Sequence, residues 1–369
     1  MTAAAQPAVA FATAPGAAAV APRPRLRTDA LNLKSCELRH PGSDRLVERA
    51  LARVRVEDTR SYPYQAQTLA ALARVHDTPV EGITLTAGSD AAIGLLVDAF
   101  ARPAGGLVVA RPAFEAWEYY ARLREVPVTG VPVLVGTPPR TDLGALAGAL
   151  ADAPSPAVVA LANPVSPAGL VLDTAEVAEL AVLAAHHGHL LVVDECYGAF
   201  TGTTHVPLLR HHPNLVVVRS CSKAYALAGA RLAAVFSRPG LAAELFKYRP
   251  DSTVSGTALA LLGQGLDALD EYRAVWADLA RIREEFVAAV LADRPGWTFL
   301  APGGNFATFV TGDPELPDRI AAGLAERGVR IRSLTSLTGL SGAFRVSLAD
   351  DATMRRVAGL IREVSDHHA

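Results

Sequence analysis

The stretch LVVVRSCSK, residues 215–223, holds the pattern that decides the fold. Its first four residues form an apolar, Val-rich run, which predicts a strand that is buried on both faces. The polar residues that follow end at Lys223, so an amine stands just past the carboxyl end of that strand. Open α/β sheets bind their ligands at this edge. The stretch therefore predicts an α/β fold with a ligand site near Lys223.

Similar short apolar runs recur from about residue 80 and alternate with segments of helical periodicity. This alternation is typical of a mainly parallel sheet that is covered by helices. One helix is marked by the capping-box pair Asp173 and Glu176 and by Gly188 after its last turn. The strands expected in the sheet are Ile83–Thr86, Leu107–Ala110, Val131–Val135, Ala157–Leu161, Leu190–Asp194, Leu215–Val218 and Leu232–Phe236.

The pattern changes after about residue 255. Apolar residues then repeat at helical spacing, which predicts one long helix over Gly265–Asp293. A smaller α+β unit should follow, with strands Asn305–Val310, Val329–Leu334 and Phe344–Leu348 and a closing helix near 352–364. We expect a disordered Ala/Pro-rich tail (1–30), an N-terminal segment packing with the small domain (31–60), a large domain (61–255) and a small domain (256–369).

Composition narrows the class of partner. With 35 Lys+Arg and 37 Asp+Glu the formal charge is −2, and half of the residues are apolar, which argues against disorder over most of the chain and against a nucleic-acid or membrane-surface partner. A small-molecule substrate fits better. No basic residue precedes Arg23, so the basic start of a secretory signal is missing, and the three cysteines fit a cytoplasmic protein. No metal site is expected, because the histidine clusters lack ligands at metal-binding spacing.

Lysine is rare here, since only Lys34, Lys223 and Lys247 occur among 35 basic residues. Solvent exposure accounts for Lys34 and Lys247. A desolvated amine at a strand end has a lowered pKa and can attack a carbonyl carbon, although a surface lysine at a strand end is the alternative for Lys223. Ser222 and Arg231 flank it, and a hydroxyl beside a guanidinium fork suits a phosphate.

Two further segments agree with this interpretation. Gly88-Ser89-Asp90 leads from a predicted strand into a helix, whose first N–H groups bind anions, although an ordinary turn would have the same composition. Asp194 ends a strand that is otherwise apolar, where a carboxylate is costly without a cation. Helix capping is the plain alternative for Asp194. The functional interpretation is that Asp194 pairs with the protonated nitrogen of a pyridine ring.

Together these residues resemble the fold-type I pyridoxal-phosphate enzymes, and within them the histidinol-phosphate aminotransferase group, over about residues 60–350. The resemblance implies a mainly parallel seven-stranded sheet in a three-layer α/β/α large domain, plus the smaller α+β domain. It implies that Lys223 forms the internal aldimine with pyridoxal 5′-phosphate, that Ser222 and Arg231 hold the phosphate, and that Asp194 binds the pyridine nitrogen. Tyr197 would bind the ring hydroxyl, and Gly88, Ser89 and Asp90 match the phosphate-binding helix start.

The resemblance extends to residues around the cofactor and substrate. Phe114 would stack on the cofactor ring, and Tyr62 would reach the phosphate of the neighbouring subunit in a homodimer with shared sites. Arg345 would grip the substrate α-carboxylate, and Asn305 would lie on a substrate-facing strand. Arg332 suggests a second anionic group on the substrate, although a surface arginine is the alternative. Ser166 departs from the family, because an asparagine normally donates to the ring hydroxyl there, and Glu37-Leu-Arg-His-Pro41 replaces the usual Glu-Asn-Pro.

We therefore expect an aminotransferase that moves an amino group between an amino acid, or an amino-phosphate-like substrate, and a 2-oxo acid. Two alternatives stay open. One is a decarboxylase or oxidase on the same scaffold, and the other is a non-catalytic binding protein that has kept the fold.

Overall fold

The computed structural model describes residues 14–21 and 29–366 of the chain. Its largest element is a seven-stranded sheet of order β2-β10-β9-β8-β7-β3-β4, in which only β10 runs antiparallel to its neighbours. The strands are β2 Ile83–Thr86, β3 Leu107–Arg111, β4 Val128–Pro132, β7 Val158–Ala162, β8 Leu190–Asp194, β9 Leu215–Ser220 and β10 Ala233–Phe236.

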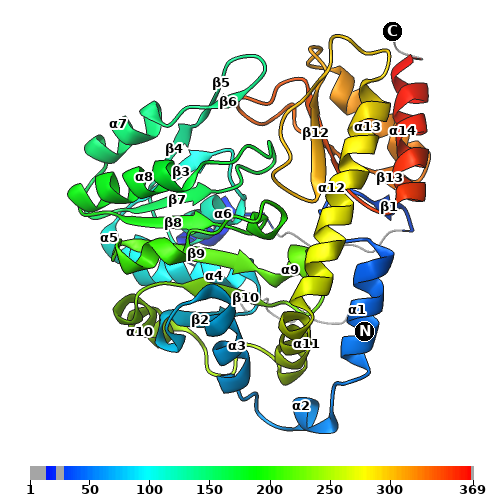
Figure 1. Cartoon of the computed structure of the whole chain (residues 1–369). Helices are drawn as coiled ribbons and strands as arrows, with labels where there is room; N and C mark the ends of the chain where they lie inside the picture. The colour runs from blue at the N-terminus through cyan, green and yellow to red at the C-terminus, as the bar shows by residue number, and fades with distance from the viewer. Residues whose placement is uncertain (1–13, 22–28, 367–369) are drawn as a thin grey trace, which may run out of the picture.

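Helices cover both faces of this sheet, so the large domain has three layers (Figure 1). Successive strand residues point to opposite faces, and Leu191 and Val193 accordingly join one core while Val192 joins the other. The first core also contains side chains of α3 Ala66–His76, α7 Gly144–Asp152, α8 Thr174–His186 and α11 Gly256–Asp267. The second contains those of α4 Ser89–Leu96, α6 Ala116–Leu123 and α10 Pro239–Tyr248.

A separate core fills the smaller domain, on the right in Figure 1. Its sheet has the order β11-β12-β15-β14 (Thr298–Phe299, Phe306–Val310, Ala343–Ser347 and Arg332–Ser333), and its helices are α12 Leu269–Leu291, α13 Leu316–Glu326 and α14 Asp351–Asp366. The N-terminal segment joins this domain, because β1 Leu31–Asn32 pairs in parallel with β13 Val329–Arg330. Two helices, α1 Pro41–Leu51 and α2 Val56–Arg60, then lead back to the large domain.

The structure corrects three of the expected elements. The helix expected over 265–293 is two helices, because Ala268 leaves the helical conformation (ψ 23°) and the apolar stripe changes from one core to the other there. The strand expected at Val131–Val135 is instead β4, which ends at Pro132, followed by β5 Leu134–Val135 in a hairpin with β6 Arg140–Thr141. The strand expected over Val329–Leu334 is divided between β13 and β14, which have different partners.

Part of the expected disordered tail is ordered. Residues Pro15–Ala19 form a 3₁₀ helix that packs on α6. Gly16 lies so close to the end of α6 that an added Cβ would be 2.5 Å from the carbonyl oxygens of Arg122 and Leu123. Only a residue without a side chain fits there. The rest of the expected tail, 1–13 and 22–28, lies outside the described residues.

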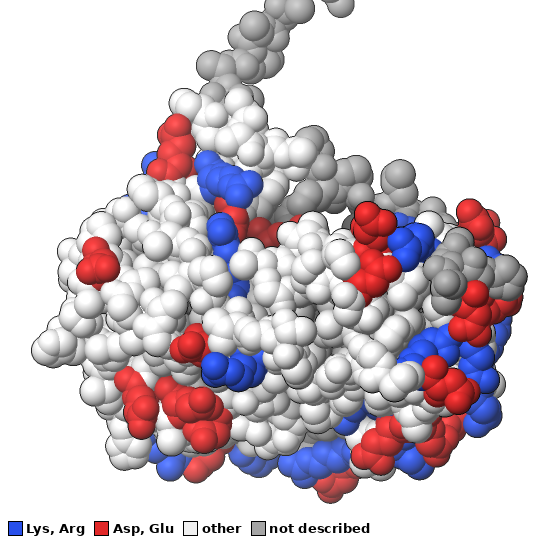
Figure 2. Space-filling model, turned by 90° about the horizontal axis from the view of Figure 1, so that it is seen from above, with Lys and Arg blue, Asp and Glu red and all other residues white. Residues whose placement is uncertain are grey.

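Charges of both signs lie intermixed on the face shown in Figure 2, and no broad area of one sign is seen there. This distribution agrees with the net charge of −2. Among the described helices, none is both long and apolar enough to cross a membrane.

Candidate functional site

The polar residues singled out in the sequence meet at one edge of the large sheet. Gly88 follows β2, Phe114 follows β3, Ser166 follows β7, Asp194 ends β8 and Lys223 follows β9. These five strands run in the same direction, so their carboxyl ends share one edge. The topology thus places the predicted site where an open α/β sheet binds its ligands.

One end of this site has the form of an anion cradle. The helix α4 begins at Ser89, and its first main-chain bond runs from Ala92 to the carbonyl of Gly88, so the N–H groups of the first turn face outward. A Cβ on Gly88 (φ 85°) would lie 2.5 Å from Arg231 Nη2, so only glycine lets the guanidinium approach. Arg231 Nη1 lies 3.5 Å from Ser222 Oγ, and both residues line a cavity of about 860 Å³. A phosphate group fits these donors.

At the other end, Asp194 is 6% exposed, and its Oδ1 accepts a hydrogen bond of 3.0 Å from the N–H of Cys196. Burial raises the pKa of this carboxyl, while the charge of Lys223 acts in the opposite direction. A buried carboxylate of this kind is stabilised by a nearby cation. The protonated nitrogen of a pyridine ring would be such a partner, so the residues present fit pyridoxal phosphate.

Lys223 lies in the short helix α9 Cys221–Ala224, directly after β9. The helix is capped by Ser220, whose hydroxyl accepts the N–H of Ser222. Lys223 Nζ donates a 2.6 Å hydrogen bond to the carbonyl of Ser35. The charge of the amine influences both Asp194 and Cys36, so it stands between the sheet edge and the N-terminal segment.

The N-terminal segment forms one wall of the site, which the sequence analysis did not foresee for residues 34–36. Arg345 Nη2 donates to the carbonyl of Lys34 at 2.7 Å, and Asn305 Nδ2 donates to that of Cys36 at 2.9 Å. The N–H of Cys36 in turn donates to Ser347 Oγ. Only their place in the sequence could have indicated this role, because residues 34–36 directly precede the unusual segment Glu37-Leu-Arg-His-Pro41.

Cys36 brings a thiol into this wall. The side chain is completely buried, which alone would raise its pKa. The charges of Arg345 and Lys223, with the polar side chains of Ser347 and Tyr197 beside the thiol, outweigh burial, so the pKa of the Cys36 thiol lies below its usual value. Burial and the nearby Cys36 raise the pKa of the Tyr197 hydroxyl well above its usual range, so Tyr197 remains a hydrogen-bond donor.

Two arginines face the same pocket from the small domain. Arg345 is 4% exposed, and its guanidinium lies 5.2 Å from the ring centre of Phe306, which also contacts the ring of Tyr197. Burial first, and then the charge of Arg345, lowers the pKa of Arg332, whereas Glu115 and Tyr197 act to raise it. The site therefore contains more positive than negative charge on this side, which favours anionic substrate groups.

Three predicted residues stand apart from this cluster or at its border. Tyr62 is 84% exposed on the loop between α2 and α3. Phe114 is 38% exposed at the carboxyl end of β3. Ser166 is half-buried in the loop that follows β7, whose neighbour Pro167 accepts a 2.6 Å hydrogen bond from Thr308 in the small domain.

Comparison with known proteins gives a family match over most of the chain. The model of the family "Aminotransferase class I and II" matches residues 28–361. A histidinol-phosphate aminotransferase of Desulfitobacterium hafniense is 31% identical over 75% of this chain and 76% of its own length. An aromatic amino acid aminotransferase of Thermobifida fusca is 32% identical over 73% of this chain and 74% of its own length.

A solved structure resembles the whole chain. The histidinol-phosphate aminotransferase of Sinorhizobium meliloti, in complex with pyridoxal-5′-phosphate, has a TM-score of 0.83 and 26% sequence identity. The alignment covers 98% of this chain and 100% of that one.

Proposed function

This chain belongs to the aminotransferase class I and II family, and on that premise we propose which residues carry its reaction and what substrate they select. It is a pyridoxal-phosphate-dependent aminotransferase that moves an amino group between an amino acid and a 2-oxo acid. When bound, pyridoxal phosphate supplies an aldehyde that condenses with amines and a ring that accepts electrons from the substrate Cα.

In this proposal the large domain holds the cofactor. Lys223 would hold the cofactor through its amine, and the same amine would move the proton at the substrate Cα, an acid/base effect of about 10²–10⁴-fold. Asp194 would pair with the ring nitrogen, Tyr197 and Ser166 would donate to the ring hydroxyl, and Phe114 would cover a face of the ring. The phosphate would be held by Ser222, Arg231 and the main-chain N–H groups of Ser89 and Asp90 at the start of α4, where Gly88 lets the guanidinium approach.

The small domain selects the substrate. Arg345 would bind the α-carboxylate, Arg332 would bind a second anionic group, and Asn305, directly before β12, would belong to a substrate-facing strand. The observation that carries the proposal is that Lys223 of the large domain and Arg345 of the small domain donate hydrogen bonds to the consecutive carbonyls of Ser35 and Lys34. The charge of Lys223 also acts on Asp194. A donor with a phosphate or side-chain carboxylate agrees with the two arginines and with the relatives named histidinol-phosphate aminotransferases.

We propose further that the protein is a homodimer in which Tyr62 completes the site of the partner subunit. The exposed apolar residues around it, Val56 at 68%, Tyr62 at 84% and Tyr64 at 85%, support this, since clustered exposed apolar side chains mark interaction surfaces. The proposed location is the cytoplasm, where the free thiols of Cys36, Cys196 and Cys221 would stay reduced.

The decisive experiment uses purified protein loaded with pyridoxal phosphate. Borohydride reduction followed by peptide mapping should attach the cofactor to Lys223, and single amino donors should convert it to the pyridoxamine form. Lys223→Ala should lose both results, and Lys247→Ala, an exposed lysine paired with Glu244, is the matched control. Donors with a second anionic group should react fastest.

The same experiment separates the alternatives. Release of carbon dioxide without the pyridoxamine form would indicate a decarboxylase instead of an aminotransferase. Release of hydrogen peroxide without that form would indicate an oxidase. Cofactor attachment without any product from a full panel of amino acids would favour a binding protein.

A further inference from the structure

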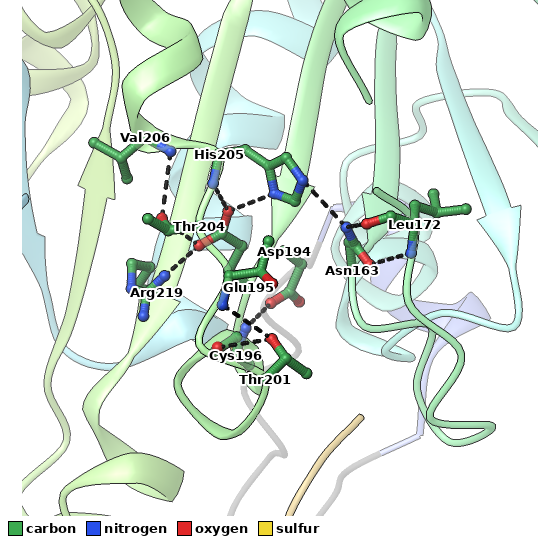
Figure 3. A network of polar contacts seen from close by, with 12 residues as sticks. Asn163, Leu172, Asp194, Glu195, Cys196, Thr201, Thr204, His205, Val206 and Arg219 are labelled. Atoms are coloured by element: carbon green, nitrogen blue, oxygen red, sulfur yellow. Dashed lines mark hydrogen bonds and ion pairs between the residues drawn. The ribbon is translucent and has the colours of Figure 1, made fainter. Parts of the chain in front are cut away.

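A buried polar network lies next to the site residue Asp194 (Figure 3). Its centre is Glu195, which is 2% exposed and follows the end of β8. The carboxylate of Glu195 accepts hydrogen bonds of 2.8 Å from Thr204 Oγ1 and from His205 Nδ1, and it forms an ion pair with Arg219. The charge of Arg219 and the bonds of His205 lower the pKa of Glu195 despite its burial, so it is a carboxylate.

The orientation of a second member, Asn163, is fixed by the main chain. Asn163 Nδ2 donates to the carbonyl of Leu172 at 2.9 Å, and Oδ1 accepts the N–H of Leu172 at 2.9 Å. A main-chain N–H can only donate and a carbonyl can only accept, so the amide has one allowed orientation. Its remaining N–H therefore points to His205 Nε2, which lies 3.4 Å from Nδ2.

These contacts determine the proton position on His205. Nε2 faces an amide donor and must accept, so the proton of the neutral ring is on Nδ1 and is donated to Glu195. The imidazole of His205 is only 1% exposed, so water cannot replace Asn163 or Glu195 as its hydrogen-bond partner. His205 thus joins the carboxylate of Glu195, just past β8, to the amide of Asn163, just past β7.

Asn163 opens a loop that borders the site, here called the Asn163 loop (residues 163–172). Its main-chain N–H donates to the carbonyl of Asp194 at 3.0 Å, and its side chain closes the loop on Leu172. Within the loop lies Ser166, and the carbonyl of Gly169 accepts the N–H of Gly303 in the small domain at 2.9 Å. The position of this loop therefore affects both cofactor binding near Ser166 and the contact between the two domains.

We propose that His205 is a positioning residue, which, as the Nδ1-protonated neutral ring anchored on Glu195, holds Asn163 and so fixes the Asn163 loop for cofactor binding. The inference rests on the proposed roles of Asp194 and Ser166. His205 itself does not contact the cofactor, and its imidazole acts only through Asn163.

Two substitutions of His205 each keep one of its two contacts, either that with Asn163 or that with Glu195. Gln at position 205 can place a carbonyl oxygen where Nε2 accepts from Asn163, while Asn can place an N–H where Nδ1 donates to Glu195. If the contact with Asn163 matters, His205→Asn should weaken pyridoxal-phosphate binding about tenfold, because it leaves a buried amide unpaired. His205→Gln should stay within about twofold of the wild type. Equal weakening in both variants, or none in either, would overturn the proposal.

A stability control accompanies these variants. Thr204→Val removes a hydrogen bond to Glu195 and the acceptor of the Val206 N–H but keeps both ring contacts of His205, so it should lower Tm and leave the cofactor dissociation constant unchanged. A fall in affinity in proportion to Tm across all three variants would show a merely structural role and overturn the proposal. If the wild type itself binds no pyridoxal phosphate, the proposed function fails and not only this inference.

A measurement on the wild-type chain without cofactor tests the proton position directly. Nitrogen NMR of ¹⁵N-histidine-labelled protein should show one histidine with a protonated Nδ1 and an unprotonated Nε2 near neutral pH, and the signal should be absent in His205→Gln. A proton found on Nε2, or a doubly protonated ring, would contradict the network.

Discussion

Arg332 and Arg345 lie directly opposite each other on β14 and β15 of the small-domain sheet. Residues so paired present their side chains on the same face, where like charges repel. Burial and this neighbour together lower the pKa of Arg332. A substrate with two anionic groups would relieve the repulsion, whereas one with a single carboxylate would relieve it only in part.

This pair predicts a split in substrate affinity. Arg345→Ala should raise KM by about 10²-fold or more for every amino donor, because a buried charged contact is lost. Arg332→Ala should raise KM about tenfold only for donors with a second anionic group. Steady-state kinetics with paired donors measures both, and Arg330→Ala, which is exposed on β13, is the control. Equal effects of Arg332→Ala on both kinds of donor would contradict its assignment.

Cys36 predicts a pH dependence of substrate binding. Its pKa lies below the usual thiol value, so the thiolate forms as pH rises through that lowered pKa. The thiolate then competes with the substrate carboxylate for Arg345, and KM should rise by about three- to tenfold on the alkaline side. In Cys36→Ser the rise should disappear, because a hydroxyl does not ionise in this range.

The matched control for that profile is Cys221→Ala. Burial raises the pKa of Cys221 to about 12, so this thiol stays neutral throughout and its removal should leave the wild-type profile in place. An alkaline rise in KM that survives in Cys36→Ser would assign the effect to another group.

Asp194 predicts opposite changes in stability and activity. Its pKa is raised by burial, so in the absence of cofactor the folded state is destabilised as pH rises through that pKa. Asp194→Asn removes the buried charge and should raise the Tm of cofactor-free protein by roughly 1–3 °C near neutral pH, with no gain at pH 4. Thermal unfolding at both pH values measures this.

The activity of the same variant should fall by about 10³-fold or more, because the ring nitrogen loses its charged partner. Asp98→Asn is the control, since that carboxylate pairs with Arg124 at a half-exposed position away from the sheet edge. A decrease in the Tm of cofactor-free Asp194→Asn would show that Asp194 is satisfied within the protein and would weaken its assignment to the ring.

The comparison of sequence and structure shows which features local patterns can predict. Five of the seven predicted strands of the large sheet agree with the structure within one residue at each end, because Val-rich runs buried on both faces leave a clear signal. β4 was misplaced, because it is an edge strand with mixed burial and the more apolar run beside it forms a hairpin. The break at Ala268 was missed, because both helices are amphipathic and their apolar stripes follow each other without interruption.

The site was predictable only in part for a related reason. Lys223, Asp194 and Gly88 stand at strand ends, so the topology rule alone brings them to one edge. The contacts of Cys36 with Arg345 and Ser347 join residues more than 300 positions apart, and no local pattern encodes them. The role of His205 could not be predicted from the sequence either, because it depends on the side-chain amide of Asn163, which is oriented by the main chain of Leu172.

The proposed dimer predicts complementation between two inactive variants. Lys223→Ala lacks the reacting amine, and Tyr62→Ala would lack the group that reaches the partner's site. In a one-to-one mixture that is unfolded and refolded together, half of the dimers would be mixed, and each mixed dimer would have one site with both residues intact. Activity should therefore recover to about a quarter of the wild-type value. Val182→Ala, an apolar residue on α8 that is 60% exposed and lies outside the cluster around Tyr62, should be active by itself and serves as the control. A mixture that stays inactive while light scattering shows dimers would place Tyr62 outside the shared site, and a monomeric active protein would remove the dimer from the proposal.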